Sequence, residues 1–251
     1  MKGGGALATD GNDIFALRGG ATTDFWSFEA SGNTWSALAA TPNRVDAGGS
    51  LVQASGFIYA LRGSGAKDFW RYSISGNSWQ SLADAPANVD WGGALTFDGS
   101  DTIYALGGAG TRSLWKYTIS TGVWSSLADA PSSVNDGGGL SYNSGFVYAL
   151  RGGNKKDFWR YSVSGDRWSS IASAPSNVKQ GGALVSLNSD YIFALRGGRK
   201  DDVWRYSISG NTWTGISNTP GKMDDGGALV SLDGKLYALR GDDKADFYRL
   251  Q

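Results

Sequence analysis

Tryptophan recurs along this chain with a period that limits what the chain can fold into. Ten of its eleven tryptophans form five pairs, and the two members of each pair are nine residues apart: Trp26 and Trp35, Trp70 and Trp79, Trp115 and Trp124, Trp159 and Trp168, and Trp204 and Trp213. The five prolines follow the same period, at steps of 44 or 45 residues: Pro42, Pro86, Pro131, Pro175 and Pro220. A fixed period of this length indicates one supersecondary unit copied along the chain.

Each copy contains four short segments that are typical of β-strands. It opens on Gly-Gly-Ala-Leu or a close variant, and this opening occurs six times, with leucines at Leu7, Leu51, Leu95, Leu140, Leu184 and Leu229. In the second copy the later segments are residues 58–63, 68–74 and 79–85, and Pro86 ends the last of them. All are short, rich in aromatic and β-branched residues, and bounded by turn residues, which predicts strands joined by hairpins. The unit is therefore expected to be a four-stranded antiparallel sheet.

One such sheet cannot bury both of its faces, whereas copies arranged radially bury one another around a central channel. The six openings predict an all-β, six-bladed β-propeller that forms one domain over residues 1–251. The expected blade repeats are 1–44, 45–88, 89–133, 134–177, 178–222 and a partial 223–251, because the sixth copy lacks its Trp-to-Pro segment. Met1 aligns with Met223 and with the valines that begin the other copies, so it is expected to begin a blade. The missing outer strand leaves an edge to which another chain can add a strand.

These residues resemble a known family. The Gly-Gly-Ala-Leu opening, the Ile-Tyr-Ala-Leu-Gly-Gly of residues 103–108, the aromatic strand, the Gly-containing turn and the Trp look like the kelch repeat of six- and seven-bladed propellers. The resemblance covers essentially the whole chain, with Arg in most copies where kelch repeats have the first Gly of a doublet. It implies a fold rather than an activity: kelch propellers mostly bind proteins, and some relatives are carbohydrate-active enzymes.

Composition excludes several function classes. The chain has no His and no Cys, so histidine general bases, thiol nucleophiles, Ser-His-Asp triads, disulfides and the usual zinc and copper sites are absent. Lys plus Arg balances Asp plus Glu at 23 each, so neither nucleic acid nor a membrane surface is an expected partner. We expect a monomer without a cofactor.

The sequence also bears on where the protein acts and how it arose. No signal peptide is evident, although the Ser-, Gly-, Asn- and Trp-rich character is typical of extracellular prokaryotic proteins. Residues 68–77 and 202–211 differ at one position, as expected after recent amplification, excision from a longer array or deliberate design.

Two polar turns have the appearance of calcium loops. They are residues 10–13 (Asp-Gly-Asn-Asp) and 98–101 (Asp-Gly-Ser-Asp). Both lack the downstream bidentate carboxylate of a calcium loop and lie where a hairpin turn is required, so the turn is the preferred interpretation.

Arginine marks the end of the second strand in five copies. The residues are Arg18, Arg62, Arg151, Arg196 and Arg240, and an aspartate follows each of them six residues later. In the third copy Gly107 and Ser113 replace both members, which suggests that Arg and Asp pair across the loop. The alternative is a ring of arginines near the channel mouth that binds a carboxylate or another anion.

Trp91 is the one tryptophan outside the pairs. Its equivalents are Gly3, Ala47, Asp136, Gln180 and Asp225, so the position varies and lies beside the inner-strand Gly pair. In kelch-like propellers this loop shares the ligand-carrying face with the loop after the second strand, and loops on a rigid scaffold are where binding residues gather. The candidate ligand-binding residues are therefore Trp91 and the five arginines, together with Arg44, Asp46, Asp90, Lys179, Lys222 and Asp224. Trp91 can stack on a sugar or anchor a peptide, or it can simply cover the gap left by the third copy's lost Arg-Asp pair.

Three functions remain. The preferred one is a non-catalytic binding or scaffolding module that takes a protein, a peptide or a glycan at the channel mouth. The second is a lectin-like, carbohydrate-binding propeller. The third is a carbohydrate-active enzyme that works with Tyr, Arg and Asp, for which the sequence contains no catalytic motif.

Overall fold

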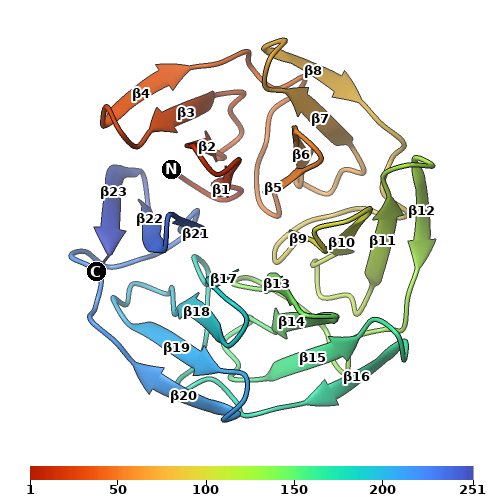
Figure 1. Ribbon diagram of the computed structural model, residues 1–251, viewed down its shortest axis with the longest axis vertical. Helices are drawn as coiled ribbons and strands as arrows, with labels where there is room; N and C mark the ends of the chain where they lie inside the picture. The colour runs from red at the N-terminus through yellow and green to blue at the C-terminus, as the bar shows by residue number, and fades with distance from the viewer. Residues whose placement is uncertain (251) are drawn as a thin grey trace.

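The computed structural model describes residues 1–250 as six antiparallel sheets arranged around a central axis (Figure 1). Blades one to three contain β1 (Ala6–Thr9), β2 (Asp13–Leu17), β3 (Phe25–Glu29) and β4 (Thr34–Ala37); β5 (Ser50–Ala54), β6 (Phe57–Leu61), β7 (Phe69–Ser73) and β8 (Ser78–Ser81); and β9 (Ala94–Phe97), β10 (Thr102–Leu106), β11 (Leu114–Thr118) and β12 (Val123–Ser126). Blades four to six contain β13 (Gly139–Asn143), β14 (Phe146–Leu150), β15 (Phe158–Ser162) and β16 (Arg167–Ser170); β17 (Ala183–Ser186), β18 (Tyr191–Leu195), β19 (Val203–Ser207) and β20 (Thr212–Gly215); and β21 (Ala228–Leu232), β22 (Lys235–Gly241) and β23 (Lys244–Leu250). The predicted six-bladed, all-β propeller is confirmed, including the sixth blade of three strands. Over the same residues the protein has no helix with the length and apolar character needed to cross a membrane.

The core of the molecule is divided among the six seams between blades. At the seam between blades one and two, Trp70 and Tyr72 of β7 are almost completely buried with Phe15 and Phe25 of blade one. The alternation of the strand places both side chains on the same face, as the sequence predicted. Phe25 meets Tyr72 in an edge-to-face arrangement, with ring centroids 4.9 Å apart. Comparable clusters fill the other seams, so each sheet buries both faces against its neighbours.

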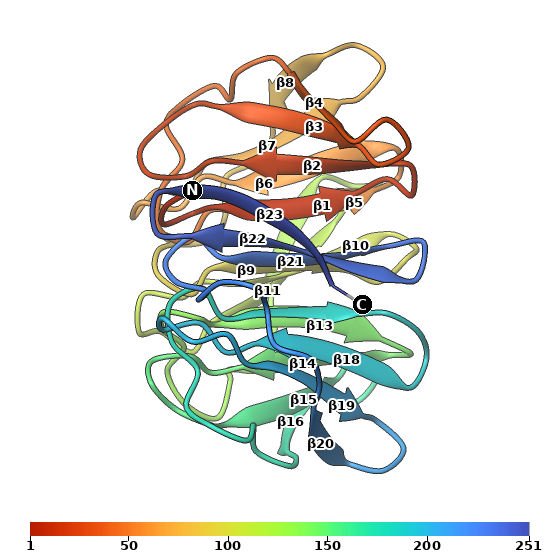
Figure 2. The same ribbon diagram turned by 90° about the vertical axis from the view of Figure 1, so that its left-hand side faces the viewer.

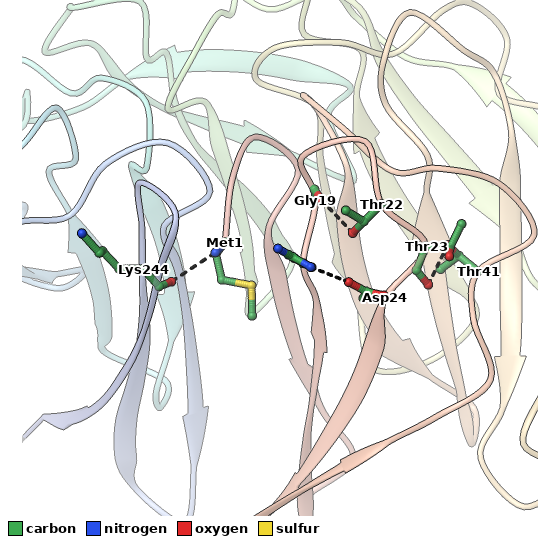
Figure 3. A network of polar contacts seen from close by, with 8 residues as sticks. Met1, Gly19, Thr22, Thr23, Asp24, Thr41 and Lys244 are labelled. Carbon is green, nitrogen blue, oxygen red and sulfur yellow. Dashed lines mark hydrogen bonds and ion pairs between the residues drawn. The ribbon is translucent and has the colours of Figure 1, made fainter.

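The ring closes at the N-terminus. Met1 occupies the place that Val45 holds in blade two, where Val45 bridges Thr22. The Met1 amino group donates a hydrogen bond to the Lys244 carbonyl at 3.1 Å, as Figure 3 shows, and the Asp243 N–H donates to the Met1 carbonyl at 2.8 Å. Met1 therefore begins a blade, as its alignment predicted. Figure 2 shows the result from the side, with β21 of the last blade lying beside β1 of the first.

Candidate functional site

Six equivalent loop positions surround one end of the central channel. Each lies on the loop that leads into the inner strand of a blade, and together they line a pocket of about 70 Å³. We call these six positions the channel mouth: Gly3, Ala47, Trp91, Asp136, Gln180 and Asp225. When the six copies are aligned, these residues occupy the same position in each copy, and the structure brings them together in one ring.

Short backbone hydrogen bonds fix the loop that carries Trp91. The Asp90 carbonyl accepts the Gly93 N–H at 2.8 Å, which closes a tight turn around Trp91. The Trp91 carbonyl accepts the Ala109 N–H at 2.8 Å from the loop after β10. Gly48 of the neighbouring mouth loop has a φ of 82°, and a Cβ atom there would collide with the backbone of Asp90. Only glycine allows adjacent mouth loops to approach this closely.

Trp91 presents an aromatic surface at the mouth. Its side chain lines the pocket and remains 45% exposed, whereas the paired Trp70 is 2% exposed. An indole on a fixed loop offers a large contact area with little conformational entropy to lose. Its exposure agrees with the prediction that Trp91 is not a core residue.

Two carboxylates share the mouth with Trp91. Burial raises the pKa of the Asp136 carboxyl, and the nearby Asp90 charge raises it further. Burial also raises the pKa of Asp225, which the charges of Asp136, Asp224 and Asp46 raise further, while a hydrogen bond from the Gly3 N–H (3.1 Å) opposes the shift. The mouth is thus an acceptor-rich site in which partly desolvated carboxylates favour a ligand that donates hydrogen bonds or carries positive charge.

Below the mouth the inner strands line the channel. The leucines of the six inner-strand openings line its middle section, a space of about 130 Å³. They also border a wider space of about 300 Å³ toward the far end, which includes Thr9, Gln53 and Ser231. The charged side chains that line the channel are therefore confined to the mouth.

The other predicted loop residues lie just outside the mouth lining. Asp46 and Asp90 are half-buried immediately before Ala47 and Trp91, and both contribute to the negative field. Asp224 is buried and accepts a hydrogen bond from Arg199 Nε at 2.7 Å, while its other oxygen has no hydrogen-bond partner among the described residues. The remaining three, Arg44, Lys179 and Lys222, are exposed and do not line the mouth pocket.

All five arginines form the predicted ion pairs. The N–O distances lie between 2.7 and 3.2 Å for Arg18–Asp24, Arg62–Asp68, Arg151–Asp157, Arg196–Asp202 and Arg240–Asp246. The Arg62 Nε atom also donates to the Arg44 carbonyl at 3.1 Å, which ties the loop to the preceding blade connection. None of the five lines the mouth pocket. These arginines therefore stabilise the loop after the second strand, and they do not line the channel mouth.

The sequence analysis recognised the six equivalent positions that form the mouth, but Trp91 was the only one of them proposed as a site residue. Asp136, Gln180 and Asp225 were recognised as its equivalents and not as site residues. A signal that could have found them was present, because this repeat position carries two carboxylates, an amide and an indole beside a glycine pair. The sequence does not show that all six positions line one pocket.

The two calcium-like turns are hairpin turns closed by their own aspartates. Asp10 Oδ1 accepts the N–H groups of Asn12 and Asp13 at 2.9 Å each. Asp98 Oδ1 accepts three successive N–H groups at 2.8 to 3.1 Å. No cluster of three or more acidic side chains suited to a metal ion is found within residues 1–250.

Comparisons with known proteins locate the chain by fold. No protein-family model matches it, and no curated protein matches it. Among solved structures, one titled "Structure of YjhT" is similar, with a TM-score of 0.77 over 99% of this chain and 94% of the other, at 16% sequence identity. The likeness extends to the fold alone.

Proposed function

We propose that this protein is a non-catalytic, kelch-like propeller that binds a protein or peptide ligand at the channel mouth. The observation that carries the proposal is Trp91. At a position where the other five blades have small or polar residues, blade three places a large aromatic side chain, exposes it, and holds its backbone in a fixed turn. Exposed aromatic residues on rigid loops are the usual energetic anchors of protein interfaces.

The chemistry of the mouth favours a basic side chain. The pocket of about 70 Å³ admits an extended lysine or arginine side chain more readily than a sugar ring. Asp136 and Asp225 supply carboxylate acceptors, and the Trp91 ring supplies a π face for the same cation. A ligand segment with one Lys or Arg that enters the mouth satisfies all three groups.

We propose a non-catalytic role because the residues at the mouth suit ligand binding better than catalysis. The mouth combines carboxylates, an amide and an indole, and the chain contains neither His nor Cys. The five arginines, which a sugar-processing enzyme could have used, are engaged with aspartates away from the mouth.

The proposal is tested by screening the wild-type protein and the Trp91→Ala variant on a combined peptide and glycan array. We expect basic peptides to bind, Trp91→Ala to weaken them at least tenfold, and higher salt to weaken them further. The Trp124→Phe variant, changed on the outer strand far from the mouth, serves as the control. Unchanged peptide binding by Trp91→Ala would contradict the assignment of the mouth as the ligand face.

A second candidate is carbohydrate binding. The exposed Trp91 ring lies beside the acceptor oxygens of Asp136 and Asp225, and stacking plus hydrogen bonds from hydroxyl groups is the usual chemistry of sugar recognition. Glycan binding on the same array, lost in Trp91→Ala and insensitive to salt, would favour this candidate.

A further inference from the structure

The outer strands of neighbouring blades are joined by a recurring contact. In four seams the outer-strand Trp donates its Nε1–H to the carbonyl of an alanine just after the preceding blade's outer strand: Trp79 to Ala39, Trp124 to Ala83, Trp168 to Ala128 and Trp213 to Ala172, at 2.8 to 2.9 Å. In three of them a turn residue two positions before the Trp accepts the N–H of that same alanine: Asn77, Asp166 and Asn211. We call this pair of hydrogen bonds the alanine clamp.

The clamped segment is also held by its own blade and packed into the seam. In blade two the Leu82 N–H donates to the Phe69 carbonyl at 2.9 Å, and the Ala85 N–H donates to the Lys67 carbonyl at 2.9 Å. The Leu82 side chain packs on the core cluster of the next seam. All five complete blades repeat the two backbone bonds, so they are properties of the fold.

The seam between blades six and one has the Trp and Asn side chains of an alanine clamp but no alanine for them to bind. Trp35 and Asn33 occupy the positions of Trp79 and Asn77, and Trp35 packs edge-on against Phe247 at 5.1 Å, as Trp79 does against Phe25. Their side chains form no hydrogen bond with any residue of the described chain, because blade six has no outer strand there. Trp35 is consequently 40% exposed, the largest exposure among the ten paired tryptophans.

Two hollows flank this unused clamp. One, of about 300 Å³, is lined by Trp26 and Trp35 together with residues at the start of β23. In the next seam along, Leu38 packs on the cluster that contains Trp70, the equivalent of Trp26. The other, of about 480 Å³, is lined by Phe28, Asn33 and Phe247. On the opposite side of β23, Ser217 is exposed at the position of the clamped Ala39, and its carbonyl has no Trp partner within the described residues.

We propose that the open edge of β23 is a docking site for an extended segment that carries the pattern of this chain's own outer strands. The pattern, taken from the five complete blades, is Trp, two variable residues, Leu or Ile, a small residue, one variable residue, Ala or Thr, and Pro. In the docked state the segment's Trp donates to the Ser217 carbonyl, and its small residue enters the clamp of Trp35 and Asn33. Its Leu N–H donates to the Phe247 carbonyl. The added strand completes blade six by β-augmentation.

A free segment suits this site better than a second copy of the chain. Every outer strand of the chain already lies in its own blade, so its withdrawal to fill blade six of another molecule opens an equal edge in the donor. Such an exchange gains no net hydrogen bonds. A segment that is extended and unpaired before binding has no such cost beyond its own ordering.

The probe is a fluorescein-labelled peptide of residues 76–86, which contains the pattern of blade two, titrated into the full chain by fluorescence anisotropy. We expect saturable 1:1 binding. Trp35→Phe keeps the ring and removes the donor, and Asn33→Ala removes the acceptor, so each is expected to weaken binding by about three- to tenfold. Trp91→Ala is the matched control and is expected to leave the affinity unchanged, which separates this site from the channel mouth.

Changes in the peptide provide a test that is independent of variant folding. Replacing the peptide's Leu82 by Pro removes the N–H that is expected to bond to Phe247, and we expect binding to be lost. Hydrogen exchange on the complex is expected to show new protection of the outward-facing Phe247 and Arg249 amides. Equal affinity for a scrambled peptide, or binding that is unchanged by Trp35→Phe and Asn33→Ala together, would overturn the proposal. Concentration-dependent protection of Phe247 and Arg249 without peptide would also overturn it, because it would assign the edge to self-association.

Discussion

At the scale of single residues, the five Arg-Asp pairs show how a repeated contact differs from a repeated binding site. Each arginine closes the loop after the second strand on an aspartate, and in four blades its Nε also reaches a carbonyl of the preceding connection. Blade three has no arginine at this position, and its Arg112 Nε donates instead to the Ala130 carbonyl, on the connection that follows the blade. The contact with the preceding connection is therefore absent from blade three.

The Arg62–Asp68 pair is expected to contribute modestly to stability. The two side chains are 25% and 36% exposed, so solvent screens their interaction. A double-mutant cycle with Arg62→Ala and Asp68→Ala, followed by urea unfolding, is expected to give a coupling of about 0.5 to 1 kcal/mol. Arg62→Ala alone is expected to cost more than Asp68→Ala, because it also loses the bond to the Arg44 carbonyl. The Arg18–Asp24 pair, at 49% and 40% exposure, is the control and is expected to couple less. Zero coupling in both pairs would show that these contacts do not contribute to stability.

The mouth carboxylates are expected to destabilise the fold at neutral pH. Because burial raises the pKa of Asp136 and Asp225 above the ordinary value of 3.8, the folded protein keeps protons that the unfolded chain has released. The free energy of unfolding therefore falls as pH rises from below 3.8 through the raised folded-state pKa values. Asp136→Asn and Asp225→Asn are expected to be more stable than wild type at about pH 7 and to lose this advantage at about pH 3.

Urea titrations of both variants across that range measure the effect, with the exposed Asp84→Asn as the control for a simple change of net charge. A gain in stability that persists at low pH would assign it to packing rather than to ionisation.

At the scale of elements, the outer strand is the part of the blade with the fewest buried side chains, yet it carries the clamp that joins one blade to the next. All four residues of β4 are exposed, and in β8 only Trp79 is half-buried. The stabilising contribution of the outer strand thus comes from Trp side chains and backbone hydrogen bonds at the seams.

The alanine clamp is expected to make Trp79 contribute more to stability than the equivalent Trp35. Trp79→Phe removes a hydrogen bond to the Ala39 carbonyl and leaves that carbonyl unpaired, so we expect a loss of about 1 kcal/mol. Trp35→Phe removes no hydrogen bond, and its cost is expected to be smaller by about that amount. Thermal and urea unfolding of the two variants gives the comparison. Equal losses would mean that ring packing, rather than the hydrogen bond, dominates at both positions.

The elements were predictable from the sequence because their signals are local and repeated. Alternation in residues 69–73 predicted the buried face of β7, and the Gly-Gly openings predicted the inner strands around the axis. The outer strand was expected to extend over residues 79–85, but β8 ends at Ser81 because the chain then turns to pack Leu82 on the next seam. The alanine clamp was not predictable, since it joins residues about 40 positions apart through a backbone carbonyl that carries no sequence signal.

At the scale of the whole molecule, the six seams are similar in design and unequal in strength. Five contain a Leu or Ile, from the segment just after the preceding blade's outer strand, packed against the core cluster. The sixth, between blades six and one, has Met1, Ala30 and Phe247 around its cluster instead. It also lacks the backbone bonds of an outer strand, and, like the seam between blades five and six, it has no alanine clamp. The ring therefore has one weak seam, at which its first and last blades meet.

We expect the molecule to open first at this seam. Local opening requires the loss of the fewest buried contacts and hydrogen bonds there, and exchange by sub-global opening follows that free energy. Native-state hydrogen exchange is therefore expected to show faster exchange in β3 and β23 than in β7 and β15, which hold the same place in complete seams. Extending the chain after Gln251 with a copy of residues 74–86, which continues the register because Leu250 aligns with Tyr72, is expected to slow exchange in β3 and β23 selectively. The extension supplies the missing strand and fills the clamp of Trp35 and Asn33. The same extension with its Trp and Leu replaced by Ser is the control. Uniform protection of all four strands in the unextended protein would show that the six seams are equally stable and that the outer strand contributes little to holding the ring closed.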